Sequence, residues 1–140
     1  MPITYRIDPG LGLVLRRFEG ETTAEDFERH WRELISDPEL PAEGPLLLVA
    51  DMCECEFRLY GEDVHQIVNC VIEPLLAGRR WVSALVVSSS TQRGVANQFM
   101  VYSERCGVTQ MFRDMDEATR WVAEFRLHWA TGLQKAFSGF

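Results

Sequence analysis

The sequence predicts a single α/β domain with a mixed five-stranded sheet, formed by an N-terminal β-hairpin and three parallel strands, and with four helices. Residues 46–50 and 81–87 are short, continuous apolar runs, as expected of parallel strands that helices cover on both faces. Amphipathic segments with helical spacing separate these runs. The chain has 140 residues, 46% of them hydrophobic, which suffices for one domain with its own core. We therefore assign residues 1–140 to one domain.

The N-terminal segment is predicted to be a hairpin followed by a helix. Apolar residues alternate over residues 3–7, and residues 13–18 form the returning strand. Thr22 and Glu25 have the spacing of a capping box, in which each side chain bonds the other residue's backbone amide. We expect the first helix to begin there and to end before Pro38, because the residue before a proline avoids helical angles.

The middle of the chain predicts a strand, a loop, a helix and a further strand. The strand at 46–50 is followed by a loop over residues 51–60, and a second helix opens at Gly61. Pro74 interrupts this helix, because proline lacks an amide donor and clashes with the preceding turn. A kink or a short separate turn is expected there.

The C-terminal third predicts a helix, a short strand and a long final helix. The third helix runs to about Cys106, and Val95, Phe99 and Tyr102 line one face of it. A strand follows over residues 108–112, and Asp114 caps the last helix.

The final helix is longer than the sheet that it covers. From Asp116 to Phe137 it would measure about 33 Å, whereas strands of five or six residues span about 17 to 20 Å. Apolar residues on the overhang must be covered, because monomers rarely expose large apolar patches. We therefore expect a homodimer; the alternative is a helix broken at Gly132, with a disordered tail. The residues expected at the dimer interface are Phe125, Trp129, Leu133 and Phe137.

Charge and composition exclude several classes of function. The net charge is −7, and nucleic acids or anionic membranes require clustered Lys and Arg. No apolar run approaches the ~20 residues of a membrane span, and the first residues lack a signal peptide's apolar stretch. The four cysteines are expected to be reduced in a cytoplasmic protein. Nothing in the sequence calls for a cofactor or a metal.

Short motifs carry a family resemblance. They are Tyr5-Arg6-Ile7-Asp8, Thr23-Ala24-Glu25-Asp26, the strand ending at Asp51, Arg93-Gly94-Val95-Ala96, and Phe112-Arg113-Asp114 leading to Ala118 and Trp121. With the order of elements, they resemble small bacterial members of the SpoIIAA-like superfamily, which contains the STAS (sulfate transporter and anti-sigma factor antagonist) domains and the CRAL-TRIO lipid-transfer domains. The resemblance covers roughly residues 3–125.

The resemblance implies a regulatory or protein-interaction domain without catalysis. Regulatory members carry a phosphorylatable Ser or Thr at the start of the second helix. The matching positions here are Tyr60-Gly61-Glu62-Asp63, and no Ser or Thr occurs over residues 38–81. That switch therefore cannot operate in its usual form, and the acidic residues complement the helix dipole.

An alternative function is binding of a small molecule. Ligands of open α/β sheets bind beyond the carboxyl ends of parallel strands. The segment from Ser88 to Gly94 offers hydroxyls, a helix N-terminus and a guanidinium that suit an anion. The candidate ligand-binding residues are Asp51, Ser89, Ser90, Thr91 and Arg93. A hydrophobic ligand is also compatible with the sequence, in a pocket between sheet and helices lined by Trp31, Phe57, Phe99, Met100 and Trp129; alternatively, these residues simply fill the core.

A third hypothesis is thiol or metal chemistry at Cys53 and Cys55. These residues flank one glutamate, a spacing that matches neither a redox Cys-x-x-Cys nor half of a zinc site. His30 and His128 lie on amphipathic helices and are expected at the core boundary. No set of nucleophile, base and orienting acid is apparent, so no catalytic residue is predicted.

Overall fold

The computed structural model describes residues 2–130, and side chains through residue 125. Its centre is one five-stranded sheet in the order β1-β2-β3-β4-β5. The strands are β1 (Ile3–Asp8), β2 (Leu13–Thr23), β3 (Leu46–Arg58), β4 (Trp81–Val86) and β5 (Gly107–Phe112). β1 is antiparallel to β2, and β2 to β5 are all parallel. The predicted mixed α/β fold is confirmed, with the second hairpin strand joining the parallel set.

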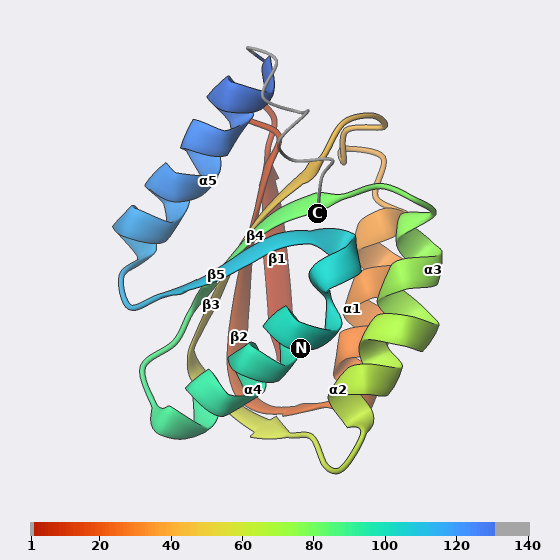
Figure 1. Cartoon of the computed structure of the whole chain (residues 1–140), viewed down its shortest axis with the longest axis vertical. Helices are drawn as coiled ribbons and strands as arrows, with labels where there is room; N and C mark the ends of the chain where they lie inside the picture. Colours follow the sequence, from red (N-terminus) through yellow and green to blue (C-terminus); the bar gives the residue numbers. More distant parts are fainter. Residues whose placement is uncertain (1, 131–140) are drawn as a thin grey trace.

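The strand order determines where the helices lie. Each parallel strand is followed along the chain by its neighbour in the sheet, and right-handed crossovers then place the connecting helices on one face. That face carries α1 (Ala24–Ile35), the segment α2 (Asp63–Gln66), η1 (Ile67–Ile72) and α3 (Glu73–Leu76), and α4 (Ser90–Tyr102) (Figure 1). The last helix, α5 (Met115–Ala130), covers the opposite face (Figure 1).

The first helix begins one residue later than predicted. Thr23, not Thr22, is the N-cap: its hydroxyl accepts from the amide of Asp26, whose carboxylate accepts from the Thr23 amide. Thr22 is buried at the end of β2, because that strand continues beside β3. The helix does begin with a capping box, but one residue later than predicted, because β2 extends to Thr23.

β3 is much longer than predicted. The expected loop over residues 51–60 is wrong for most of its length, because the strand continues to Arg58. Its second half pairs with the end of β2, from Glu19↔Glu54 to Thr23↔Arg58, after a register shift. The apolar run therefore marks only the half of β3 that helices cover on both faces.

The second helix changes its winding before Pro74. The turns over Ile67–Ile72 are π-helical, and α3 then starts with Glu73 and Pro74 in its first turn. The expected interruption at Pro74 is confirmed, and Ala77 ends the segment in a left-handed conformation.

α4 ends at Tyr102 instead of near Cys106, and a 3-10 turn, η2 (Glu104–Cys106), leads into β5. Of the residues expected on one face of this helix, Phe99 is buried, whereas Tyr102 is 45% exposed. Gly107 starts β5 with φ +141, and a Cβ there would lie 2.1 Å from the carbonyl oxygen of Trp81. Only glycine permits this approach of β5 to β4.

α5 is capped as predicted, since Asp114 Oδ1 accepts from the amides of Asp116 and Glu117. Of the residues expected at a dimer interface, Phe125 is half-buried and packs at the edge of the α5 cluster, with its ring 4.9 Å from that of Trp121. The side chain of Trp129 lies outside the described part, as do Leu133 and Phe137. No described helix is long and apolar enough to cross a membrane.

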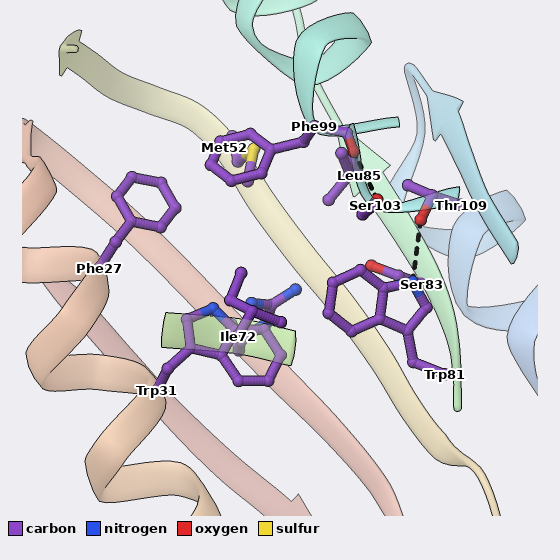
Figure 2. A pocket seen from close by; sticks show the side chains of 11 residues that line it. Phe27, Trp31, Met52, Ile72, Trp81, Ser83, Leu85, Phe99, Ser103 and Thr109 are labelled. Carbon is purple, nitrogen blue, oxygen red and sulfur yellow. Dashed lines mark hydrogen bonds between the residues drawn. The ribbon is translucent and has the colours of Figure 1, made fainter. Parts of the chain in front are cut away.

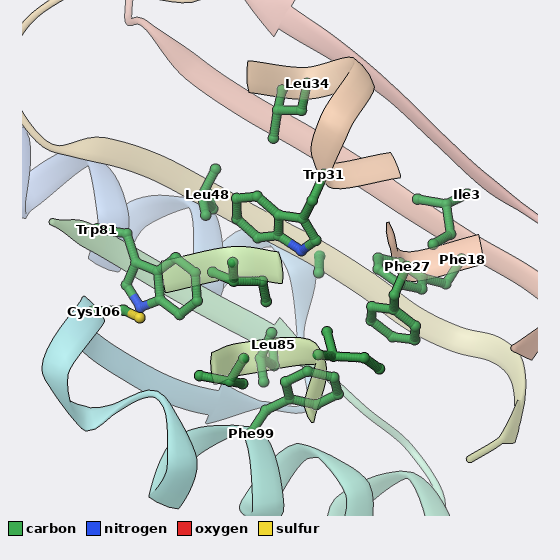
Figure 3. Close-up of a cluster of buried hydrophobic side chains, with 14 of the residues drawn as sticks. Ile3, Phe18, Phe27, Trp31, Leu34, Leu48, Trp81, Leu85, Phe99 and Cys106 are labelled. Carbon is green, nitrogen blue, oxygen red and sulfur yellow. The ribbon is translucent and has the colours of Figure 1, made fainter. Parts of the chain in front are cut away.

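Two apolar clusters hold the layers together. The larger lies between the sheet and the helices α1 to α4, and Figure 3 shows its aromatic centre, including Phe18, Phe27, Trp31, Trp81 and Phe99. The smaller lies under α5 and contains, for example, Val49, Val82 and Val122. The larger cluster also contains the candidate site.

Candidate functional site

The predicted anion-binding segment is largely closed by its own side chains. Ser89 caps α4, and Gln92 Oε1 accepts from the amides of Ser88 (2.8 Å) and Ser89 (3.2 Å). The Gln92 amide group donates to the carbonyls of Cys53 (3.1 Å) and Cys55 (3.0 Å). Gln92, only 6% exposed, thus fastens this loop to β3 and occupies two amides that an anion would need.

The hydrogen bonds of Gln92 form a junction between this loop and β3, and the other predicted ligand-binding residues lie around it. Ser90, Thr91 and Arg93 are exposed on the first turn of α4, and Asp51 is half-buried on β3 beside Val86. Asp51 accepts a bond from the Cys53 amide (3.1 Å). The structure therefore brings the two predicted loops together, joined by protein hydrogen bonds.

Cys53 and Cys55 lie on opposite faces of the sheet. An undisturbed strand would place residues two apart on one face, but the β2–β3 register shift adds a residue to β3. Cys53 consequently packs toward α5 and Cys55 toward α1 to α4. Burial raises the pKa of both thiols, which opposes thiolate formation. Within the described residues, no cluster of three or more His, Cys, Asp or Glu side chains suits a metal.

A pocket lies inside the larger cluster, between the sheet and its helices (Figure 2). Phe27 and Trp31 of α1 stand on one side, Trp81 on the other, and Phe99 with Met52 closes a third side. The remaining lining residues are Arg16, Ile72, Ser83, Leu85, Ser103 and Thr109. Of the residues predicted for a hydrophobic pocket, Trp31 and Phe99 line it, whereas Phe57 and Met100 do not.

Arg16 is the unusual member of this pocket. It is 5% exposed, and burial lowers its pKa to about 10, so the guanidinium remains charged at neutral pH. It stacks against Trp31 (5.5 Å to the ring centroid) and Phe18 (5.7 Å). Over residues 2–125, no hydrogen-bond acceptor or carboxylate pairs with it, and its buried Nε has no partner.

Three hydroxyls share the pocket with Arg16. Thr109 accepts from the indole N–H of Trp81 (3.0 Å), and Ser103 donates to the carbonyl of Phe99. Ser83 lies on β4 in the same lining and is buried. The pocket therefore combines one cation, neutral hydroxyls and aromatic walls, and none of its described lining residues is acidic.

His30 lies next to this cation instead of at the core boundary as predicted. It is 4% exposed among the rings of Tyr5, Phe18 and Trp31. Burial, together with the charge of Arg16, lowers the pKa of His30 to about 3. Its imidazole is neutral near pH 7, so it supplies no second charge to the site.

Sequence reasoning missed Arg16, although a signal was present. Val14 and Phe18 are core residues of one strand, and a residue midway between them shares their face. The alternation therefore places the Arg16 side chain in the core. The aromatic walls come from separate elements, and no spacing along the chain reveals that they meet.

Comparison with known proteins identifies the fold. No family model and no curated protein matches the sequence. A similar solved structure is an uncharacterised protein of the DUF3478 family with a SpoIIAA-like fold, from Shewanella loihica. It is 18% identical, the match covers 86% of this chain and 93% of that one, and the TM-score is 0.59. The chain thus has a SpoIIAA-like fold, which is the fold that the resemblance implied.

Proposed function

We propose that this protein is a non-enzymatic binding domain for a small organic acid, whose carboxylate pairs with Arg16. One observation carries the proposal: a buried guanidinium faces an aromatic pocket, and no described residue provides its anion. An isolated buried charge is costly, whereas a charge-assisted pair with a carboxylate offsets part of that cost. A ligand carboxylate would therefore supply the missing partner.

The size and chemistry of the pocket restrict the ligand. The cavity holds about 20 Å³, roughly the space of one water molecule. A carboxylate with a body of a few carbons is larger than this space, so it would bind only with displacement of the flexible Met52 side chain. A phosphate dianion fits poorly, because one guanidinium among apolar walls leaves its second charge uncompensated. We therefore favour a short-chain monocarboxylate.

This proposal reverses the order suggested by the sequence, in which a regulatory or interaction domain came first and a small-molecule carrier second. Gln92 closes the predicted anion loop, and Arg16 provides a different cationic site. The two anion sites can be separated by experiment, because Arg93 is exposed and Arg16 is buried.

The test is a thermal-shift titration of the purified protein with acetate, propionate and butyrate at constant ionic strength. Acetamide, propionamide and phosphate serve as comparison compounds. We expect the carboxylates to raise Tm with concentration, because they bind the native state alone. Arg16→Met should abolish this response, whereas Arg93→Ala should retain it.

Three results would count against the proposal: an equal response in Arg16→Met, a response lost in Arg93→Ala, or no response to any carboxylate. Native mass spectrometry of each variant shows that a folded protein is being compared. Arg16→Met replaces a buried charge with an apolar chain of similar length, so we expect it to fold.

A further inference from the structure

We infer that the open sheet edge at β1 is a docking site for an extended peptide segment with basic side chains at alternate positions. This inference is independent of the pocket. β1 is one of the two outermost strands of the sheet and pairs only with β2. Edge strands of this kind accept an additional strand from a partner, with backbone bonds providing affinity and side chains providing specificity.

The register shows which backbone groups face outward. The Glu19 amide donates to the Pro2 carbonyl, and Ile3 lies opposite Phe18. Since bonding alternates along an antiparallel pair, the amides and carbonyls of Ile3, Tyr5 and Ile7 point away from β2. No backbone hydrogen bond from another described element closes this side. The backbone groups of these three alternate residues are therefore available to a partner strand.

A groove with an acidic rim follows this edge. It measures about 470 Å³ and is lined by residues 3–7 together with Glu33, Asp37 and Glu39. Asp37 is held in place by the Tyr5 hydroxyl, which donates to its carboxylate at 2.7 Å and lowers its pKa. Arg6 is the one basic residue among the described lining, so acidic groups outnumber it.

Charge identifies the occupant. Tyr5 bonds Asp37, so side chains on the Tyr5 face of an added strand would approach the acidic rim. A basic residue at alternate positions would pair with the rim. The β1 strand of a second copy offers only Ile3, Tyr5 and Ile7 there, and none of these side chains carries a positive charge that could pair with the rim. A basic peptide therefore complements this edge better than a second copy does.

The test uses fluorescence anisotropy with a labelled peptide, acetyl-Thr-Lys-Val-Lys-Val-Lys-Thr-amide. The control peptide replaces each Lys with Glu. We expect the Lys peptide alone to bind, and Glu33→Gln combined with Glu39→Gln to weaken binding about fivefold or more. Glu104→Gln, on the distant η2 turn, should leave binding unchanged.

Two further measurements test the backbone contacts. Ile7→Pro removes one outward amide and no bond to β2, so it should reduce binding without unfolding the sheet. Hydrogen exchange should slow at Ile3, Tyr5 and Ile7 on peptide addition. Equal binding of both peptides, unchanged exchange at these amides, or no binding would refute the inference. So would self-association that Ile7→Pro abolishes, since it would identify a second copy as the occupant.

Discussion

At the scale of single residues, the buried Arg16 and its neighbour His30 are the unexpected features of the site, and neither was identified from the sequence. The alternation from Val14 to Phe18 places Arg16 in the core, but a lone charged residue in a strand is usually assigned to the solvent face. His30 follows the helical spacing of α1, and its burial depends on rings from β1 and β2. Contacts of this kind between distant segments cannot be recognised from the local sequence pattern.

The first prediction concerns the pH dependence of stability. Folding lowers the pKa of His30 from 6.5 to about 3, so the unfolded chain binds a proton that the native protein excludes. The contribution of neutral His30 to the free energy of unfolding is therefore complete above pH 6.5 and is lost as the pH falls toward 3. Its slope is at most about 1.4 kcal/mol per pH unit.

The free energy of unfolding, measured in urea at several pH values between about 5 and 6.5, tests this pH dependence, since most carboxylates stay ionised in that range. His30→Phe keeps a ring in the aromatic cluster and should flatten the profile. A variant with the same slope as the parent protein would show that His30 is not the group responsible.

At the scale of elements, the type and order of the strands and helices followed from the sequence, whereas several ends did not. Apolar runs identified β3 and β4, and Pro74 marked the change in the second helix. The second half of β3 was missed because it depends on the continued pairing of β2, a distant segment. The bulge that places Cys53 and Cys55 on opposite faces of the sheet has the same origin, and it was not predicted either.

The junction made by Gln92 leads to a second prediction. Gln92→Ala would leave the amides of Ser88 and Ser89 and two β3 carbonyls without their partner, and should lower the free energy of unfolding by about 2 kcal/mol. Denaturant unfolding measures the change. Asn97→Ala, exposed on the same helix, should stay within about 0.5 kcal/mol of the parent. Similar values for the two variants would contradict a structural role for the junction.

At the scale of the whole molecule, the predicted α/β architecture is confirmed, because the alternation of elements restricts the possible topologies to a few. The assembly state remains a prediction from the spacing of Phe125, Trp129, Leu133 and Phe137. We expect a homodimer whose contacts include the end of the last helical segment.

Sedimentation velocity tests this third prediction. Combining Trp129→Glu with Phe137→Glu should convert a dimer to a monomer, because a buried charge opposes apolar association. Arg93→Glu, on the exposed start of α4, should leave the sedimentation coefficient unchanged. A parent protein that already sediments as a monomer would remove the dimer from consideration.

The strand order also bears on how the chain folds as it is synthesised. Since every strand lies beside the one that precedes it, each new unit can pack on a sheet that already exists, and no strand waits for a distant partner. The face under α5 is different, because its apolar residues Leu47, Val49, Val82 and Val86 emerge well before the helix that covers them. Between the emergence of β4 and that of α5, a nascent chain therefore exposes an apolar sheet face, and such exposed surface favours aggregation.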